Sequence, residues 1–103
     1  MATNKEFEVI KSMYFRAIGK ASMKIDDSLK QAKEKNGFEN GSMLTRIYKD
    51  HLNEATENIN PVTFENEYGI EEAVRDEEGN LVYDKKDALK MLQAIEHINT
   101  YIL

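Results

Sequence analysis

Two histidines with glutamates close by are the residues whose chemistry most directly suggests a metal site. His51 and Glu54 stand three residues apart on one face of an expected helix, and Glu96 and His97 are adjacent on another. A di-iron helical bundle uses Glu-x-x-His on two helices. Here the order is His-x-x-Glu, it occurs once, and adjacent helical residues point in different directions. The sequence therefore predicts packed or half-exposed histidines, no metal and no cofactor.

No group of residues in the sequence matches a catalytic motif. The chain has no cysteine, which excludes a thiolate nucleophile, a disulfide scaffold and Cys-based zinc sites. The five glycines are scattered, so none of them forms a phosphate-binding loop. Neighbouring acids such as Asp26-Asp27 lie in hydrophilic surroundings, where carboxylates stay ionised. We therefore expect a binding protein with no catalytic residues.

The charge is unevenly distributed along the chain. The formal net charge is −5 over 103 residues. Residues 61–84 contain eight acids and one basic residue, Arg75, whereas residues 1–60 and 85–103 each carry a net charge of +1. The whole excess of negative charge therefore lies in one segment.

Two interpretations of this acidic segment are open. It is either a solvated hairpin whose charges prevent edge-to-edge association, or a docking face for a protein partner with a basic surface. Direct binding of nucleic acid is not expected, because the negative charge repels phosphates. The leading hypothesis is a small acidic protein-binding factor, such as an inhibitor, adaptor or immunity-type protein. The candidate partner-binding residues crowd the expected turn and the strand before it: Glu71, Glu72, Asp76, Glu77 and Glu78.

Apolar residues at spacings of three and four predict three helices that would position these groups. The first is expected over Asn4–Lys35. The second is expected to begin with Ser42 as N-cap and to end before Asn60-Pro61. The third follows an acidic capping pair, Asp84 and Asp87, and runs to the C-terminus.

Residues 62–83 have a different pattern. Glu77-Glu78-Gly79-Asn80 is a turn signal between Ala73-Val74 and Leu81-Val82-Tyr83, which favours a short hairpin. A helix through Ile70–Val74 is the alternative, because its apolar spacing also fits. The expected fold is thus mainly α, of the α+β class. It is a single domain, residues 1–103, with a long N-terminal helix and one acidic hairpin between the second and third helices.

The length of the first helix raises the question of self-association. A 32-residue helix is about 48 Å long, which overhangs a compact domain of this size. Either the helix breaks near Gly19 or Lys24–Asp27, or its overhang contacts a second copy. Its wide apolar arc favours a homodimer, which makes a self-associating structural component the alternative function. The candidate self-association residues are Met13, Tyr14, Phe15 and Ile18.

The sequence also predicts a cytoplasmic location. The N-terminal residues are polar and are not followed by an apolar run of signal-peptide length. No segment approaches the roughly 20 apolar residues of a membrane span. We therefore expect no membrane partner.

Overall fold

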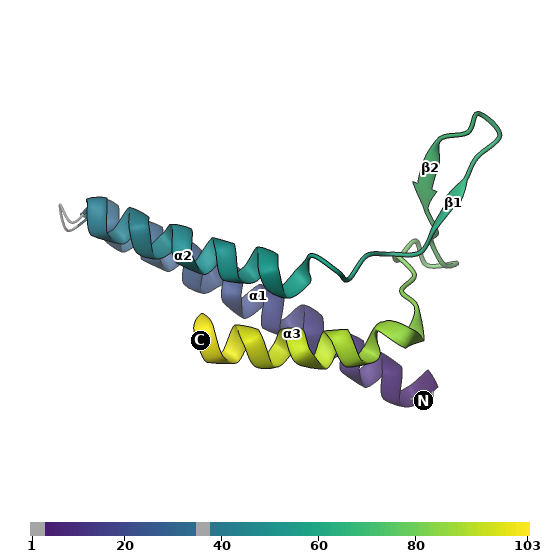
Figure 1. Ribbon diagram of the computed structural model, residues 1–103, viewed down its shortest axis with the longest axis horizontal. Helices are drawn as coiled ribbons and strands as arrows, with labels where there is room; N and C mark the ends of the chain where they lie inside the picture. The colour runs from purple at the N-terminus through teal and green to yellow at the C-terminus, as the bar shows by residue number, and fades with distance from the viewer. Residues whose placement is uncertain (1–3, 35–37) are drawn as a thin grey trace.

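Three helices and a small two-stranded sheet make up the protein, in a computed structural model that describes residues 4–34 and 38–103. α1 (Asn4–Glu34) and α2 (Phe38–Thr56) run antiparallel, and α3 (Ala88–Tyr101) lies along both of them (Figure 1). The antiparallel strands β1 (Thr63–Glu65) and β2 (Glu71–Ala73) form a hairpin between α2 and α3. The predicted fold, mainly helical with a long first helix and an inserted hairpin, is confirmed.

α1 is one unbroken helix, so the predicted alternative of a break at Gly19 or at Lys24–Asp27 is wrong. Its 31 residues are about 46 Å long at 1.5 Å per residue, close to the longest dimension of the molecule, 51 Å. A Cβ at Gly19 would meet no atom within 4 Å, so this glycine lies on an open helix surface. A buried stripe continues along the whole helix instead: Phe7, Tyr14, Ala17, Ala21, Ile25 and Ala32.

α3 is held by the apolar stripe that it buries against the other two helices. Met91 and Ile98 are fully buried, and burying a side chain of this size contributes roughly 1.5–3 kcal/mol. Ile98 packs in one cluster with Ala17 and Ala21 of α1, whose small side chains leave room for it. Since α3 has only 14 residues, it covers about half of the α1–α2 pair (Figure 1).

α2 is shifted along the chain relative to the prediction. It begins at Phe38, so Ser42 lies inside the helix and is not its N-cap, and it ends at Thr56, before Asn60-Pro61. The local turn preference behind the predicted start is a weak signal that helix packing overrides. Ile59 lies beyond the helix but is buried in the core, so its apolar character marks a core position and not a helical one. Lys35, the predicted last residue of the first helix, lies outside the described residues.

The acidic pair before α3 has two different roles. Asp84 Oδ1 accepts a hydrogen bond from the Lys86 N–H (3.0 Å) and caps a short 3₁₀ turn, Lys85–Asp87. Asp87 makes no capping hydrogen bond; it is buried and pairs with Lys90 at 3.6 Å. Only Asp84 therefore acts as the predicted side-chain cap.

The segment between α2 and α3 contains two turns where one was predicted. The expected turn at Glu77–Asn80 is present, with Gly79 at a φ of 84°. The two strands, however, flank another turn, Asn66–Ile70, in which Gly69 has a φ of 75°. Only glycine adopts this left-handed conformation without steric cost. The turn at Gly79 was predicted from the sequence, whereas the turn at Gly69 was not.

The strand assignments change accordingly. The predicted flanks, residues 73–74 and 81–83, are joined across their turn by a single bridge between Arg75 and Leu81. The alternative helix through Ile70–Val74 is wrong, because Glu71–Ala73 is β2. The turn at Asn66–Ile70 brings β1 beside residues 71–73, so these residues pair with β1 and not with residues 81–83.

Tyr14, one of the predicted self-association residues, belongs to the core. It is 2% exposed and clusters with Phe7 and Met91. Burial, together with the neighbouring Tyr83, raises the pKa of the Tyr14 hydroxyl from 10.0 to about 12. The folded protein therefore keeps this hydroxyl neutral at a pH where the unfolded chain ionises it.

We expect the free energy of unfolding to fall between pH 10 and 12 because of Tyr14. Below pH 10 the hydroxyl is protonated in both states and its contribution is constant. Above pH 10 the unfolded chain loses the proton first, which costs about 2 kcal/mol of stability by pH 11.5. Urea denaturation at pH 9 and pH 11.5 measures the loss. Tyr14→Phe should lose correspondingly less, and an equal loss in both proteins would contradict the assignment.

Candidate functional site

Residues 62–83, here called the arm, project from the helical body (Figure 1). Three valines join the arm's segments at its base. The Val74 N–H donates to the Val62 carbonyl (2.8 Å), the Val62 N–H to the Val82 carbonyl (2.8 Å), and the Val82 N–H to the Val74 carbonyl (3.1 Å). The six backbone groups therefore form a closed ring, which joins the start of the β1–β2 hairpin to the point where the chain returns toward α3.

The two turns of the arm have the same construction. Asn66 Oδ1 accepts the N–H groups of the residues two and four positions later, at 2.9 and 3.0 Å. Asp76 Oδ1 does the same in the second turn, with both distances 2.9 Å. Both turns have glycine at the fourth position. The same four-residue pattern therefore occurs twice, ten positions apart: Asn or Asp, then Glu, then any residue, then Gly. This pattern is a turn signal in the sequence. Only its second occurrence was predicted to be a turn.

The structure places all five predicted partner-binding acids on the arm, and all are exposed. Asp76 is also structural, because its carboxylate holds its own turn. Glu71 accepts a hydrogen bond from the Thr63 hydroxyl across the hairpin. The remaining three acids are Glu72, Glu77 and Glu78. Their gathering on one projecting element is observed, whereas their role in binding stays a prediction.

Glu65 is the acid that the sequence analysis missed. The register places it directly opposite Glu71, and like charges in this position destabilise an antiparallel pair. The two glutamates border a shallow depression of about 390 Å³, together with Phe64 and Gly69. A Cβ on Gly69 would lie 3.3 Å from Glu65 Oε1, so glycine keeps the depression open. The opposition follows from the turn at Asn66–Ile70, which is why it could not be predicted without that turn.

Large apolar side chains lie exposed among these acids. Phe64 is 48% exposed, Ile70 60% and Tyr68, at the tip of the hairpin, 79%. The turn ordered by Asn66 holds Tyr68 and Ile70 in solvent, and Phe64 lies in β1. Apolar groups gathered in this way on a projecting element are typical of a contact surface for another molecule.

The arm is fastened to α1 by its last residue, Tyr83. The ring of Tyr83 packs edge-on against that of Phe15, with centroids 5.5 Å apart and planes at 66°. Beside this contact lies an open cavity of about 580 Å³ between α1 and the second turn, lined in part by Lys11 and Asp76. Phe15, predicted as a self-association residue, therefore contributes to positioning the arm.

The other predicted self-association residues differ in exposure. Ile18 is partly buried against both core clusters, whereas Met13 is exposed on α1. With Tyr14 in the core, only Met13 and the partly engaged Phe15 remain on the surface. Homodimerisation through α1 stays a prediction.

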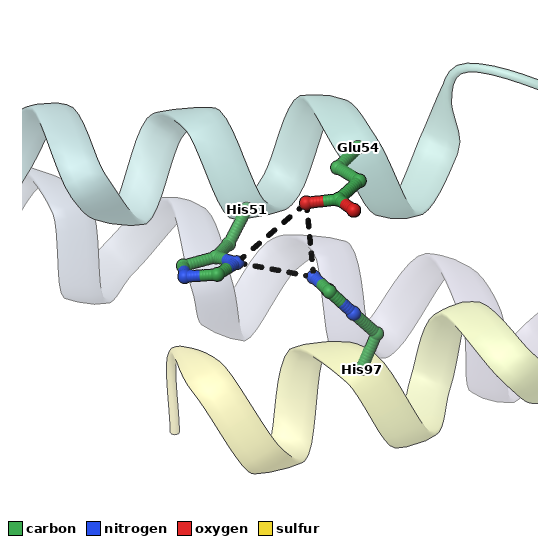
Figure 2. Close-up of side chains that lie close together, drawn as sticks. All are labelled: His51, Glu54 and His97. Carbon is green, nitrogen blue, oxygen red and sulfur yellow. Dashed lines mark hydrogen bonds and ion pairs between the residues drawn. The ribbon is translucent and has the colours of Figure 1, made fainter.

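α2 and α3 bring together the two histidines that the sequence analysis treated separately. His51 Nδ1 lies 3.2 Å from His97 Nε2, and Glu54 Oε2 lies 3.9 Å from each of these nitrogens (Figure 2). The ring of Tyr101 stacks on His51 at 4.7 Å and 12°, and contacts His97 at 4.6 Å and 44°. The histidines are 46 residues apart in the chain, so only helix packing pairs them.

Comparison with known proteins adds no relative to these observations. No protein-family model matches the chain, no curated protein matches its sequence, and no solved structure matches it. Within residues 4–34 and 38–103, none of the helices has the length and apolar composition needed to cross a membrane. The arm and the histidine cluster are the two features from which a function can be argued.

We expect the second turn to require an oxygen acceptor at position 76 and not a charge. Asp76→Asn should keep the turn, because Asn66 holds the first turn with the same Oδ1 contacts. Asp76→Ala should open it, with loss of protection of the Glu78 and Asn80 amides in hydrogen exchange by about tenfold or more. The amides of Tyr68 and Ile70 are the internal control. Equal protection in the Ala and Asn variants would show that the carboxylate contacts do not organise the turn.

Proposed function

We propose that this protein is a small binding factor that docks a basic protein surface through its arm. The single observation that carries the proposal is the opposed pair Glu65 and Glu71, which borders an open depression on the hairpin. Two directly opposed carboxylates repel each other in the free protein. A cationic side chain placed between them relieves that repulsion.

An arginine of the partner fits this depression best. Its guanidinium is planar and presents several N–H donors, so it can bond both carboxylates at once. A lysine would satisfy the charge but could not bond both carboxylates with the same planar geometry.

The remainder of the arm supports the same kind of contact. Exposed charges act mainly on association rate and on the choice of partner. Buried aromatic and apolar anchors slow dissociation, because they exclude water at the centre of an interface. Tyr68 and Ile70 are available as anchors on the first turn, and Glu72, Glu77 and Glu78 add negative charge to the strand after it and to the second turn.

Inhibition is the mode of action that this chemistry suggests. The carboxylates of the arm would occupy the positions of phosphates on a basic protein surface that normally binds nucleic acid. The bound arm then competes with the nucleic acid for the same surface. The rival function, self-association through α1, is less well supported, because Tyr14 and Phe15 are engaged within the chain.

Reversal of the arm's charges tests the proposal. The wild-type chain is used as bait in a lysate of its native host, and the captured basic partner is purified. Changing Glu65, Glu71 and Glu72 together to lysine should slow association with that partner by about tenfold or more. Stability should change little, because a Lys–Lys pair replaces a Glu–Glu pair across the strands. Stopped-flow or surface-based kinetics at two ionic strengths measures the effect.

The matched control is a triple reversal at Asp26, Asp27 and Glu34, which are exposed in the C-terminal part of α1, and this end of α1 lies far from the arm (Figure 1). It changes the net charge by the same amount and should alter the association rate by less than about twofold. If both triples slow association equally, net charge alone matters. If neither does, the arm is a solvated surface and the proposal is wrong.

A further inference from the structure

Three side chains on two helices direct metal-binding atoms toward one point. His51 Nδ1 and Glu54 Oε2 come from successive turns of α2, and His97 Nε2 comes from α3 (Figure 2). These atoms all lie within 4.8 Å of one another. The packing of α3 on α2 creates the convergence, and none of the three residues belongs to the arm.

The separations match those between the ligands of a small tetrahedral ion. Zinc binds imidazole nitrogen at about 2.0–2.1 Å and carboxylate oxygen at about 2.0–2.2 Å, which puts neighbouring ligand atoms about 3.3 Å apart. The two nitrogens are 3.2 Å apart, and each is 3.9 Å from the carboxylate oxygen. A small rotation of the exposed Glu54 side chain closes the remaining difference. Two imidazoles and one carboxylate are also a donor set that suits zinc.

The charges of the cluster favour a cation at this point. The ion pairs of Glu54 in the described part of the chain are those with His51 and His97, and neither histidine supplies positive charge unless it is protonated. Two neutral imidazoles can face each other only if one nitrogen carries the proton and the other accepts it. A metal ion replaces that shared proton, which moves through solvent to an outer ring nitrogen. All three inner atoms then present lone pairs to the ion.

The site is largely preorganised. The ring of Tyr101 stacks on His51 and contacts His97, which holds both imidazole rings in place. The histidine side chains are 27% and 23% exposed, so most of each ring is already removed from water, whereas Glu54 is 65% exposed. Solvent can therefore reach the ion from the glutamate side and supply a fourth ligand.

We propose that His51, Glu54 and His97 bind one divalent transition-metal ion, with zinc as the best match and water as the fourth ligand. The ion links α2 to α3, the two helices that the arm connects. It closes a loop that contains the whole arm, so binding stabilises the fold and the base of the arm together.

Zinc titration of the chelator-treated, untagged full chain tests this site. Isothermal calorimetry should give one zinc ion per chain, with a Kd of about 10 µM or tighter. At a hundredfold excess over Kd, zinc should raise Tm by about 10 °C. Magnesium should have no effect, because it prefers oxygen ligands. In NMR spectra, zinc should shift the ring signals of both histidines at the same molar ratio.

Variants separate the site from adventitious binding. His97→Ala should weaken zinc binding by more than about 100-fold, since it removes one of three ligands. Glu96→Ala changes the adjacent exposed residue and should leave the Kd unchanged within about twofold. Far-UV circular dichroism of each variant checks that it folds.

Three results would overturn the proposal. The first is zinc binding that survives the combined His51→Ala and His97→Ala change. The second is a stoichiometry of one zinc per two chains, because the ligands would then come from different copies. The third is a Kd in the millimolar range for the wild-type chain, together with an unchanged Tm.

Discussion

The ring of three valine hydrogen bonds at the base of the arm is the interaction on which the functional surface depends. β1 and β2 have three residues each, and an isolated hairpin of that length is marginal in water. Val62, Val74 and Val82 each donate one backbone hydrogen bond and accept one. The ring joins the chain before the first turn, between the two turns and after the second turn. Neither turn therefore has to be stable alone. It also leaves the outer part of the hairpin free to carry exposed charge and apolar groups.

The packing of α3 on α1 and α2 is the second constraint, and it acts on both functional features. Tyr83, just after the ring, packs against the α1 core and against Phe15. Further along, the fully buried Met91 and Ile98 fix the position of α3, and with it the position of His97 opposite His51. One helix therefore sets the direction in which the arm leaves the body and the separation of the histidines. Because α3 follows the arm in the chain and also carries His97, an ion bound between α2 and α3 would influence the arm.

The helices could be predicted from the sequence because their information is local. The stripe from Phe7 to Ala32 has helical periodicity, and α1 follows it closely. The acidic segment could also be predicted, since composition alone reveals it. The turn at Asn66–Ile70 was missed although its pattern is local. The sequence signals a turn at Glu77–Asn80, and Ile70–Val74 also fits helical spacing, so no turn is predicted at Asn66–Ile70.

The site residues depended on information that no single segment contains. Glu65 faces Glu71 only after the register of β1 and β2 is known. His51 and His97 meet only through the packing of two helices separated by the arm. Neither His51 with Glu54 nor His97 with Glu96 forms a metal-binding motif within its own helix. Tertiary convergence of this kind is visible only in three dimensions.

Docking through the arm, as proposed, requires an arm that is folded in the free protein and does not fold only on a partner. Hydrogen exchange of the Val62, Val74 and Val82 amides in the isolated chain tests this most directly. If the ring exists, all three amides should exchange at least about 100-fold more slowly than in an unstructured chain. Exchange of these amides at unstructured rates, while the amides of α1 and α3 remain protected, would contradict the account.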